Sequence, residues 1–190
     1  MLLLVGLGNP GSNSVNNRHN IGFKIIDAVN AHFKLSKQKP KFKGLLTTGN
    51  IESKKIYAIK PLTFMNNSGT AIKELIDYFK IDAKDVFVFH DDMDIDFGKI
   101  KAKFGGSSAG HNGIDSIDKF IGKDYSRVRI GIGHPKQKNK VNHHVLEDFK
   151  EDEEEKIKEI AENIVKLIPT LIEKKIDLFS SKVNQNLNGI

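Results

Sequence analysis

Cysteine and tryptophan are absent from this chain of 190 residues, and proline occurs only five times. The lack of cysteine excludes a disulfide framework and a thiolate metal site. No run approaches the roughly 20 apolar residues of a membrane helix. The short apolar start, Met1–Gly6, lacks the basic residues that open a signal peptide. We therefore expect a cytoplasmic protein with no membrane partner, and the length fits a single domain over residues 1–190.

The charges are unevenly distributed along the sequence. The net charge is +6, yet residues 147–155 (EDFKEDEEE) contain seven acids and one lysine. The rest of the chain is therefore strongly basic, which suits a polyanionic partner such as a nucleic acid. A solvated, lysine-rich surface explains the same composition equally well, so charge alone leaves both interpretations open.

Short apolar or alternating runs that end in glycine or polar residues predict six strands. These lie at 2–7, 44–48, 51–60, 86–89, 98–104 and 127–133. The second and third form a hairpin, for which a turn at 52–55 is an alternative. Strands that alternate with helical segments indicate an α/β fold. We expect a single domain of three layers (αβα) around a mixed, mostly parallel, twisted sheet.

Apolar residues at helical spacing predict helices between these strands. They cover 21–33, 69–80 after a capping Ser68, 114–121, and a C-terminal segment of about 151–180. The acids of 151–155 suit the positive end of the last helix, which gives the acidic run a structural explanation. Pro169 is expected to kink or split that helix.

Gly6–Gly11 matches the dinucleotide-binding pattern G-x-G-x-x-G after a strand. That mechanism requires a helix to begin at once, so that its amides meet the pyrophosphate. Residues 12–17 have no apolar stripe and intervene before the helix. The pattern therefore does not support a nucleotide cofactor.

Gly106–Gly110 matches G-x-S-x-G, the nucleophile elbow of serine esterases, with Ser108 at its centre. No histidine follows Asp148 to complete the usual order, although Asp118 and His134 would make a variant triad. Gly110 and Gly113 disfavour the helix that should begin at the serine. A flexible polar loop is the preferred interpretation, and a serine esterase is kept as an alternative.

Polar side chains with catalytic or binding capacity gather in the predicted loops, mostly just beyond strand ends. In open α/β sheets, ligands bind outside the carboxyl ends of the strands, so such loops can converge on one cleft. Each residue alone is explained by a turn or a helix cap. The set consists of Asn9, His19, Asn66, Asp91, His111 and Asn112.

Basic residues alternate on two predicted strands. Lys99, Lys101 and Lys103 share one face of their strand, and Arg127 and Arg129 share one face of theirs. The two rows are suited to binding phosphates, and a solvated sheet face is the alternative.

Five ordered motifs resemble those of bacterial peptidyl-tRNA hydrolases, with weaker similarity as far as Phe149. They are Val5–Gly11 followed by Arg18–Asn20, Lys60–Gly69, His90–Asp94, Gly110–Gly113 and Arg129–Pro135. The resemblance implies hydrolysis of the ester between a peptide, or an N-blocked aminoacyl group, and the 3′ end of tRNA. It also implies a cytoplasmic monomer whose partner is tRNA, at its acceptor end and 5′-phosphate region, and no cofactor.

The same resemblance assigns roles to residues. His19 is the catalytic base, Asp91 holds and charges its imidazole, and Asn9 distinguishes blocked aminoacyl groups from free ones. The resemblance also implies further substrate contacts, including two residues that bind the tRNA 5′-phosphate, Lys103 and Arg129. The others are Ser14, Phe64, Met65, Asn66, Gly110, His111 and Asn112.

The chemistry agrees with these roles. Water at neutral pH is a poor nucleophile, and a neutral imidazole that accepts its proton activates it. A carboxylate on the other ring nitrogen fixes the tautomer and stabilises the imidazolium. Asn amides read a peptide backbone without charge. No metal is required, and no cluster of Cys and His supplies a site for one.

Four positions depart from the family pattern. Ser14 stands where an aromatic Tyr contact is usual, Asn17 where Thr is usual, and Ala109 where Gly is common. Asp115 stands where a basic residue is frequent. We therefore expect an active enzyme with an altered substrate grip. The alternatives are the serine esterase and a tRNA-binding module without catalysis.

Overall fold

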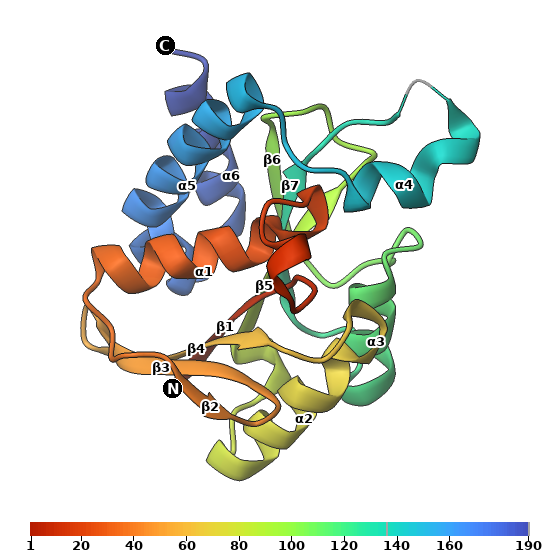
Figure 1. The fold of residues 1–190 in the computed structure, drawn as a ribbon. Coiled ribbons are helices and arrows are strands. Elements are labelled where there is room, and N and C mark those ends of the chain that lie inside the picture. The colour runs from red at the N-terminus through yellow and green to blue at the C-terminus, as the bar shows by residue number, and fades with distance from the viewer. Residues whose placement is uncertain (136, 190) are drawn as a thin grey trace.

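A mixed sheet forms the centre of the computed structural model, which describes residues 1–135 and 137–189 (Figure 1). Its strands are β1 (Leu2–Gly6), β2 (Lys39–Lys41), β3 (Gly44–Ile51), β4 (Lys54–Pro61), β5 (Val86–Asp92), β6 (Ile100–Phe104) and β7 (Ser126–Gly131). Across the sheet the order is β2-β3-β4-β1-β5-β7-β6. The parallel pairings join β4, β1, β5 and β7 at the centre, while β2, β3 and β6 are joined by antiparallel pairings.

Helices cover both faces of the sheet (Figure 1). One face carries α1 (Ile21–His32), α5 (Glu151–Ile172) and α6 (Ile176–Leu187), and the other carries α2 (Ser68–Phe79) and α3 (Asn112–Ile121). A short helix, α4 (Val141–Leu146), lies away from both layers and beside the turn that precedes α1. The predicted α/β class, with a mixed sheet between helical layers, is confirmed.

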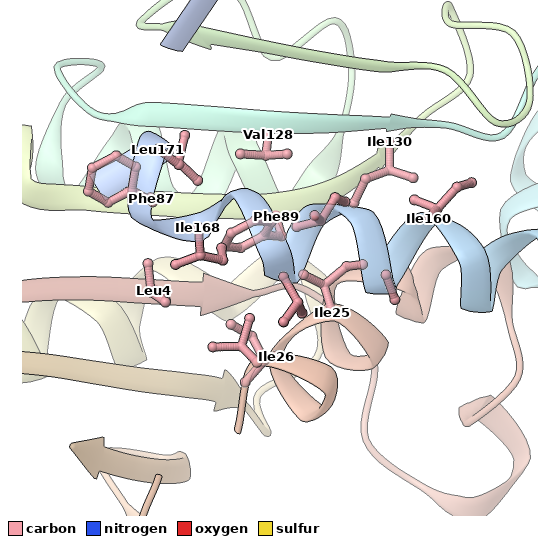
Figure 2. Packing of buried hydrophobic residues seen from close by; sticks show 14 of the residues in the cluster. Leu4, Ile25, Ile26, Phe87, Phe89, Val128, Ile130, Ile160, Ile168 and Leu171 are labelled. Atoms are coloured by element: carbon pink, nitrogen blue, oxygen red, sulfur yellow. The ribbon is translucent and has the colours of Figure 1, made fainter. Parts of the chain in front are cut away.

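The central strand β1 is apolar throughout because both of its faces are covered. Leu2 and Leu4 pack in the cluster under α1 and α5, whereas Leu3 and Val5 pack in the cluster under α2 and α3. Figure 2 shows the first cluster, in which side chains of α1 and α5 pack against those of β1, β5 and β7. Burial of each such side chain contributes about 1.5–3 kcal/mol to the free energy of folding. This packing holds the central strands, whose ends carry the site.

Several predicted boundaries were wrong. The strand predicted at 86–89 runs on to Asp92, because its pairing with β7 continues to the register Asp92↔Gly131. His90 and Asp91 are therefore strand residues and not loop residues. Ser68 does not cap α2: it is the first helical residue, and its hydroxyl donates to the carbonyl of Met65.

Two elements were not predicted, and one turn was left open. β2 is a three-residue edge strand that contains Pro40, a residue tolerated at an edge where no ladder donor is needed. α4 has only six residues, too few for a periodic pattern. The predicted division of the hairpin into 44–48 and 51–60 was wrong, because β3 continues to Ile51; the chain turns at residues 52–53, within the alternative turn at 52–55.

The C-terminal segment forms two helices and extends past the predicted limit of 180 to Leu187. The helix does not break at Pro169, which lies in the last turn of α5. The chain leaves the helical path after Ile172, and Lys174 turns it towards α6 with a left-handed φ of 63°. Within the described residues, no helix is long and apolar enough to cross a membrane.

Candidate active site

Glycines let α1 begin directly over the ends of β1 and β5. A Cβ on Gly22 would collide with the main chain of Leu7 and Phe89, and one on Gly6 would collide with the main chain of Gly22. Only glycine permits such close approach of helix and sheet. The glycines of the G-x-G pattern therefore serve packing, and the turn Arg18–Asn20 is held over the strand ends.

Two histidines converge on the carboxylate of Asp91 at the end of β5. His19 Nδ1 lies 2.8 Å and 2.9 Å from its two oxygens, and His111 Nε2 lies 2.9 Å from Oδ1. Nδ1 of His111 accepts from the N–H groups of Gly113 and Ile114, so its proton is on Nε2. His19 likewise donates through Nδ1, which leaves the lone pair of its Nε2 free.

The buried carboxylate controls the charge of His19. Burial lowers the pKa of His19, but the charge of Asp91 and their hydrogen bond outweigh it, so the pKa is raised above 6.5. Burial raises the pKa of Asp91, and His19 and His111 reverse that effect and hold it well below its usual range. Asp91 is therefore an anion that strengthens the base beside it.

His90 supports Asp91 from the preceding position of β5. Its Nδ1–H donates to the main-chain carbonyl of Asp91 at 2.7 Å. Burial lowers the pKa of His90 to about 3, so the ring stays neutral. Sequence reasoning quoted this residue within a motif but gave it no role, because only its buried neighbours reveal one.

Asn9 is held so that one end of its amide is free. Its Oδ1 accepts from the N–H of Met65 at 2.9 Å, while its main chain is bonded at both N and O by the side chain of Asn20. Among the described residues, no partner uses its Nδ2. Asn20 is 2% exposed and was missed as a positioning residue. The sequence offered one indication of this role: Asn20 directly follows His19 and precedes a predicted helix.

Six of the predicted residues line one cleft of about 250 Å³. They are Asn9, His19, Phe64, Met65, Asn66 and Asn112. Phe64 is 67% exposed and Met65 is buried, so they form the outer and inner wall. The cleft is completed by α4, through Asn142, Val145 and Leu146, which sequence reasoning did not include.

A second, smaller pocket of about 90 Å³ adjoins the first at His19. It is lined by the end of β5, the glycine-rich loop and α4, with the predicted residues Asp91, Gly110, His111 and Asn112 among them. In this loop Ala109 has a φ of 49°, a left-handed conformation that favours glycine. His19 and α4 therefore line both the cleft and the second pocket.

α3 begins at Asn112, two residues before its predicted start. The ring of His111 caps it by accepting from the first amides, which also fixes the tautomer that faces Asp91. Gly113, expected to disfavour helix, lies inside α3, and a Cβ there would force the side chains of Met65 and Leu7 to shift. Asp115 is in the first turn, where an acid suits the helix dipole.

The acidic run anchors the turn that carries His19. Arg18 is 4% exposed and bonds the carboxylate of Glu153 at 2.9 Å and the carbonyl of Asp148 at 3.1 Å. Asn17 bonds the side chain of Asp148 at 2.7 Å. Glu153 also accepts from the N–H of Lys150 at the start of α5. The run thus joins α5 to the site, beyond its predicted effect on the helix dipole.

Three predicted substrate contacts line neither the cleft nor the second pocket. Ser14 is half-buried in a 3₁₀ turn and lines neither pocket. Lys103 is half-buried on β6, and burial followed by the charges of Arg129 and Arg127 lowers its pKa. Arg129 on β7 donates to Asp92 at 2.7 Å, and 20% of its side chain is exposed.

The two basic rows do share one face, because Lys103 pairs with Arg127 and Lys101 with Arg129. The expectation that all of them form a phosphate surface was wrong for Arg127. Its side chain is 1% exposed, pairs with Asp118 at 2.8 Å and donates to the carbonyl of Ser107. α3 covers this end of the row, so Arg127 is a structural residue.

The variant serine triad is not formed. Ser108 Oγ accepts from the N–H of Gly110 and has no histidine partner among the described residues. Asp118 is engaged by Arg127 and Tyr125, and His134 is paired with Asp94 at 2.8 Å. The helix also begins at Asn112 and not at the serine. The geometry therefore does not support a nucleophile at Ser108.

The atoms of His19, Asp91 and His111 that could bind a metal lie within 4.8 Å of one another. The same atoms of the three residues are joined by the hydrogen bonds to Asp91. A metal at this point would displace the proton that His19 Nδ1 shares with the carboxylate. The arrangement therefore favours base catalysis by His19.

Comparisons with known proteins agree with one family. A family model described as peptidyl-tRNA hydrolase matches residues 3–189. The peptidyl-tRNA hydrolase of Pelagibacter ubique (strain HTCC1062) is 73% identical, covering 97% of this chain and 99% of the relative. That of Ehrlichia ruminantium (strain Welgevonden) is 45% identical, covering 95% and 93%. The crystal structure of peptidyl-tRNA hydrolase from Acinetobacter baumannii has a TM-score of 0.90 and 33% identity, covering 97% and 94%.

Proposed function

The chain belongs to the peptidyl-tRNA hydrolase family and hydrolyses peptidyl-tRNA, and from this premise we propose that His19 is its general base. One observation carries the proposal: the imidazole lines the cleft and donates through Nδ1 to a buried carboxylate at 2.8 Å, while its Nε2 has no hydrogen-bond partner among the described residues. That orientation is the one in which a histidine accepts a proton from water.

In the proposed step, Nε2 of His19 removes a proton from a water molecule that attacks the ester carbonyl. Asp91 stabilises the imidazolium that forms, because its charge lies against the protonated ring. The proton then passes to the leaving 3′-oxygen of the ribose as the carbon–oxygen bond breaks. The products are a peptide with a free carboxylate and tRNA with a free 3′ end.

The amides of the cleft position the acyl group. Asn9 offers Nδ2 to a carbonyl of the blocked amino group, since Met65 holds its oxygen. Asn66 and Asn112 line the same cleft and supply donors for the ester carbonyl as it becomes an oxyanion. A donor of this kind is worth about 10²–10³ in kcat in other hydrolases.

The tRNA end of the substrate is assigned to the β6–β7 edge. Lys103 and Arg129 keep part of their side chains exposed on one sheet face, and we assign them the 5′-phosphate. Phosphate contacts supply most of the affinity for nucleic acids and make it depend on salt. A monomer in the cytoplasm stays the expected form of the enzyme.

The test of the base is His19→Ala, assayed by release of peptide from peptidyl-tRNA. We expect kcat to fall by about 10²–10⁴, the usual contribution of a positioned base. His32→Ala is the matched control, because His32 is an exposed histidine of α1 outside the site, and its kcat should not change.

Near-normal turnover by His19→Ala would contradict the assignment. Ser108→Ala in the same assay separates the serine esterase, which requires that variant to be inactive. A binding module would be supported instead if the unmodified chain bound tRNA in a salt-sensitive way and did not cleave the ester.

A further inference from the structure

A second basic surface lies on β2 and the residues beside it, at the opposite edge of the sheet from β6 (Figure 1). Its lysines alternate along the chain and are all exposed: Lys37, Lys39, Lys41 and Lys43. In an extended strand such alternate residues share a face and lie about 6.7 Å apart. Within the described residues only Lys43 pairs with a carboxylate, that of Glu74 at 3.4 Å. The other three lysines therefore have no acidic partner in the described part of the chain.

The lysines adjoin an aromatic cluster that the turn after β2 forms with α2. The ring of Phe42 is buried, and its centre lies 5.3 Å from that of Tyr78 and 5.6 Å from that of Phe79. Nζ of Lys41 lies 4.7 Å from the centre of the Tyr78 ring. Tyr78 nevertheless keeps 63% of its surface exposed. A cation and an aromatic ring are thus presented together at the surface.

The turn between β2 and β3 has a conformation that its residues disfavour. Phe42 and Lys43 have φ values of 53° and 55°, in a two-residue hairpin turn where Asn and Gly are usual. A bulky residue is strained there, and such strain persists only where the surroundings impose it. Burial of the Phe42 ring against α2 offsets the strain and holds Lys41 beside Tyr78. The two groups are therefore preorganised, which lowers the entropic cost of binding a ligand.

Lysines beside an exposed aromatic ring are suited to unpaired RNA. Ammonium groups bind its phosphates, and its bases stack on aromatic rings. A surface for anionic membranes would instead present a helix with a large apolar face. The exposed residues of α2 beside the lysines include Glu74 and Asp77, which would repel such a membrane. Asp77 is paired with Lys73, so neither acid neutralises the lysines of β2.

The position of this surface separates it from the tRNA of the substrate. β2 and β6 are the two edges of a seven-stranded sheet, roughly 29 Å apart at the usual spacing of strands. The proposed function places the tRNA 5′-phosphate at Lys103 and Arg129, on the β6–β7 edge. An RNA bound at β2 is therefore a second molecule.

We propose that the β2 edge binds an unpaired stretch of a second RNA. Lys37, Lys39 and Lys41 contact its phosphates, and Tyr78 stacks on one of its bases. That this RNA is not the substrate tRNA rests on the proposed function. The site would retain the enzyme on RNA while the cleft at His19 stays open to peptidyl-tRNA.

The test measures binding of a fluorescein-labelled oligouridylate of about 10 nucleotides by fluorescence anisotropy across salt concentrations. One variant combines Lys37→Gln, Lys39→Gln and Lys41→Gln, and another is Tyr78→Leu, which keeps an apolar cover on the cluster. The matched control combines Lys158→Gln, Lys166→Gln and Lys182→Gln, which removes the same charge from exposed lysines of α5 and α6. Circular dichroism checks the fold of each variant.

We expect the triple variant of the β2 edge to bind at least about tenfold more weakly at low salt. Its slope of log affinity against log salt should fall by about 2, because each contact with a single strand contributes about 0.7. Tyr78→Leu should lose about fivefold, the value of one weak stacking contact. The control triple should bind within about twofold of the unmodified chain, and kcat/KM for peptidyl-tRNA should stay within about twofold in all three.

The proposal is overturned if the unmodified chain does not bind the oligouridylate, or if the control triple loses as much affinity as the β2 triple. A matching loss of kcat/KM in the β2 triple would assign the surface to the substrate tRNA instead. Lysine-dependent binding to phosphatidylglycerol vesicles without binding to RNA would assign it to a membrane. Failure of the proposed base is distinguishable, because His19→Ala concerns cleavage and should bind the oligouridylate as the unmodified chain does.

Discussion

The end of β5 and the β6–β7 edge use charged residues in opposite ways. At the end of β5, Asp91 is 2% exposed and receives two histidine donors, and this buried charge leaves Nε2 of His19 free for chemistry. At the edge, Arg127 and Arg129 form ion pairs with Asp118 and Asp92. On β6, Lys101 is exposed and Lys103 is half-buried. A buried charge thus has different consequences in the two regions.

The difference is explained by what covers each strand. β5 is central and its end meets the turn before α1, so its carboxylate has partners and an open cleft at once. α3 covers one end of the basic row and leaves the other end uncovered. Residue type alone therefore does not separate a catalytic charge from a structural one.

The largest effect is expected from Asp91→Asn. An amide can hold His19 in the wrong tautomer and cannot stabilise the imidazolium, and the equivalent change in another hydrolase lowers kcat by about 10⁴. The activity of the native enzyme should fall as the pH drops through the raised pKa of His19, because protonation removes the base. In the variant that pKa is lowered by burial alone, so the acid limb of the residual activity should move to lower pH.

The measurement is the pH profile of kcat for both forms. Asp77→Asn is the matched control, because Asp77 is an exposed carboxylate of α2 paired with Lys73. An acid limb at unchanged pH would show that Asp91 does not set the charge of His19.

The next effect concerns stability. Arg127→Met removes the cation of a buried pair and leaves the carboxylate of Asp118, whose side chain is 10% exposed, with the hydroxyl of Tyr125 but no cation beside it. Breaking such a pair costs about 3–5 kcal/mol of unfolding free energy, which urea denaturation measures. Lys101→Met on the same face should change stability by less than about 0.5 kcal/mol, because Lys101 is exposed. Equal stability of the two variants would contradict the assignment of Arg127 as a structural residue and Lys101 as a surface residue.

The smallest effect is expected from Lys103→Gln. If Lys103 binds a phosphate as proposed, removing this cation should weaken tRNA binding and lower the slope of log affinity against log salt by about 1. The kcat at saturating substrate should stay within about twofold, since Lys103 lines neither pocket at His19. Lys55→Gln on β4 is the control, and a similar loss of affinity there would mean that net charge, and not position, is responsible.

Much of the fold was predictable from local patterns. The apolar run of β1 and the stripe of α1 have the periods of a buried strand and an amphipathic helix, and both were placed within one residue at either end. The boundaries of β5 and α3 were wrong because strand pairing decided the first and a histidine cap decided the second, and neither contact is part of the periodicity.

The class of the fold, the order of the motifs and the residue types that meet at the strand ends follow from patterns along the chain. Which charged side chains are paired, and which atoms are left without a partner, depends on contacts in three dimensions. The partners of Arg18 lie 130 and 135 residues away, Asp91 lies 72 residues from His19, and α4 lines the cleft from a segment with no periodic signal. Hydrogen bonds and burial depend on distance in space, and a pattern along the chain does not encode that distance.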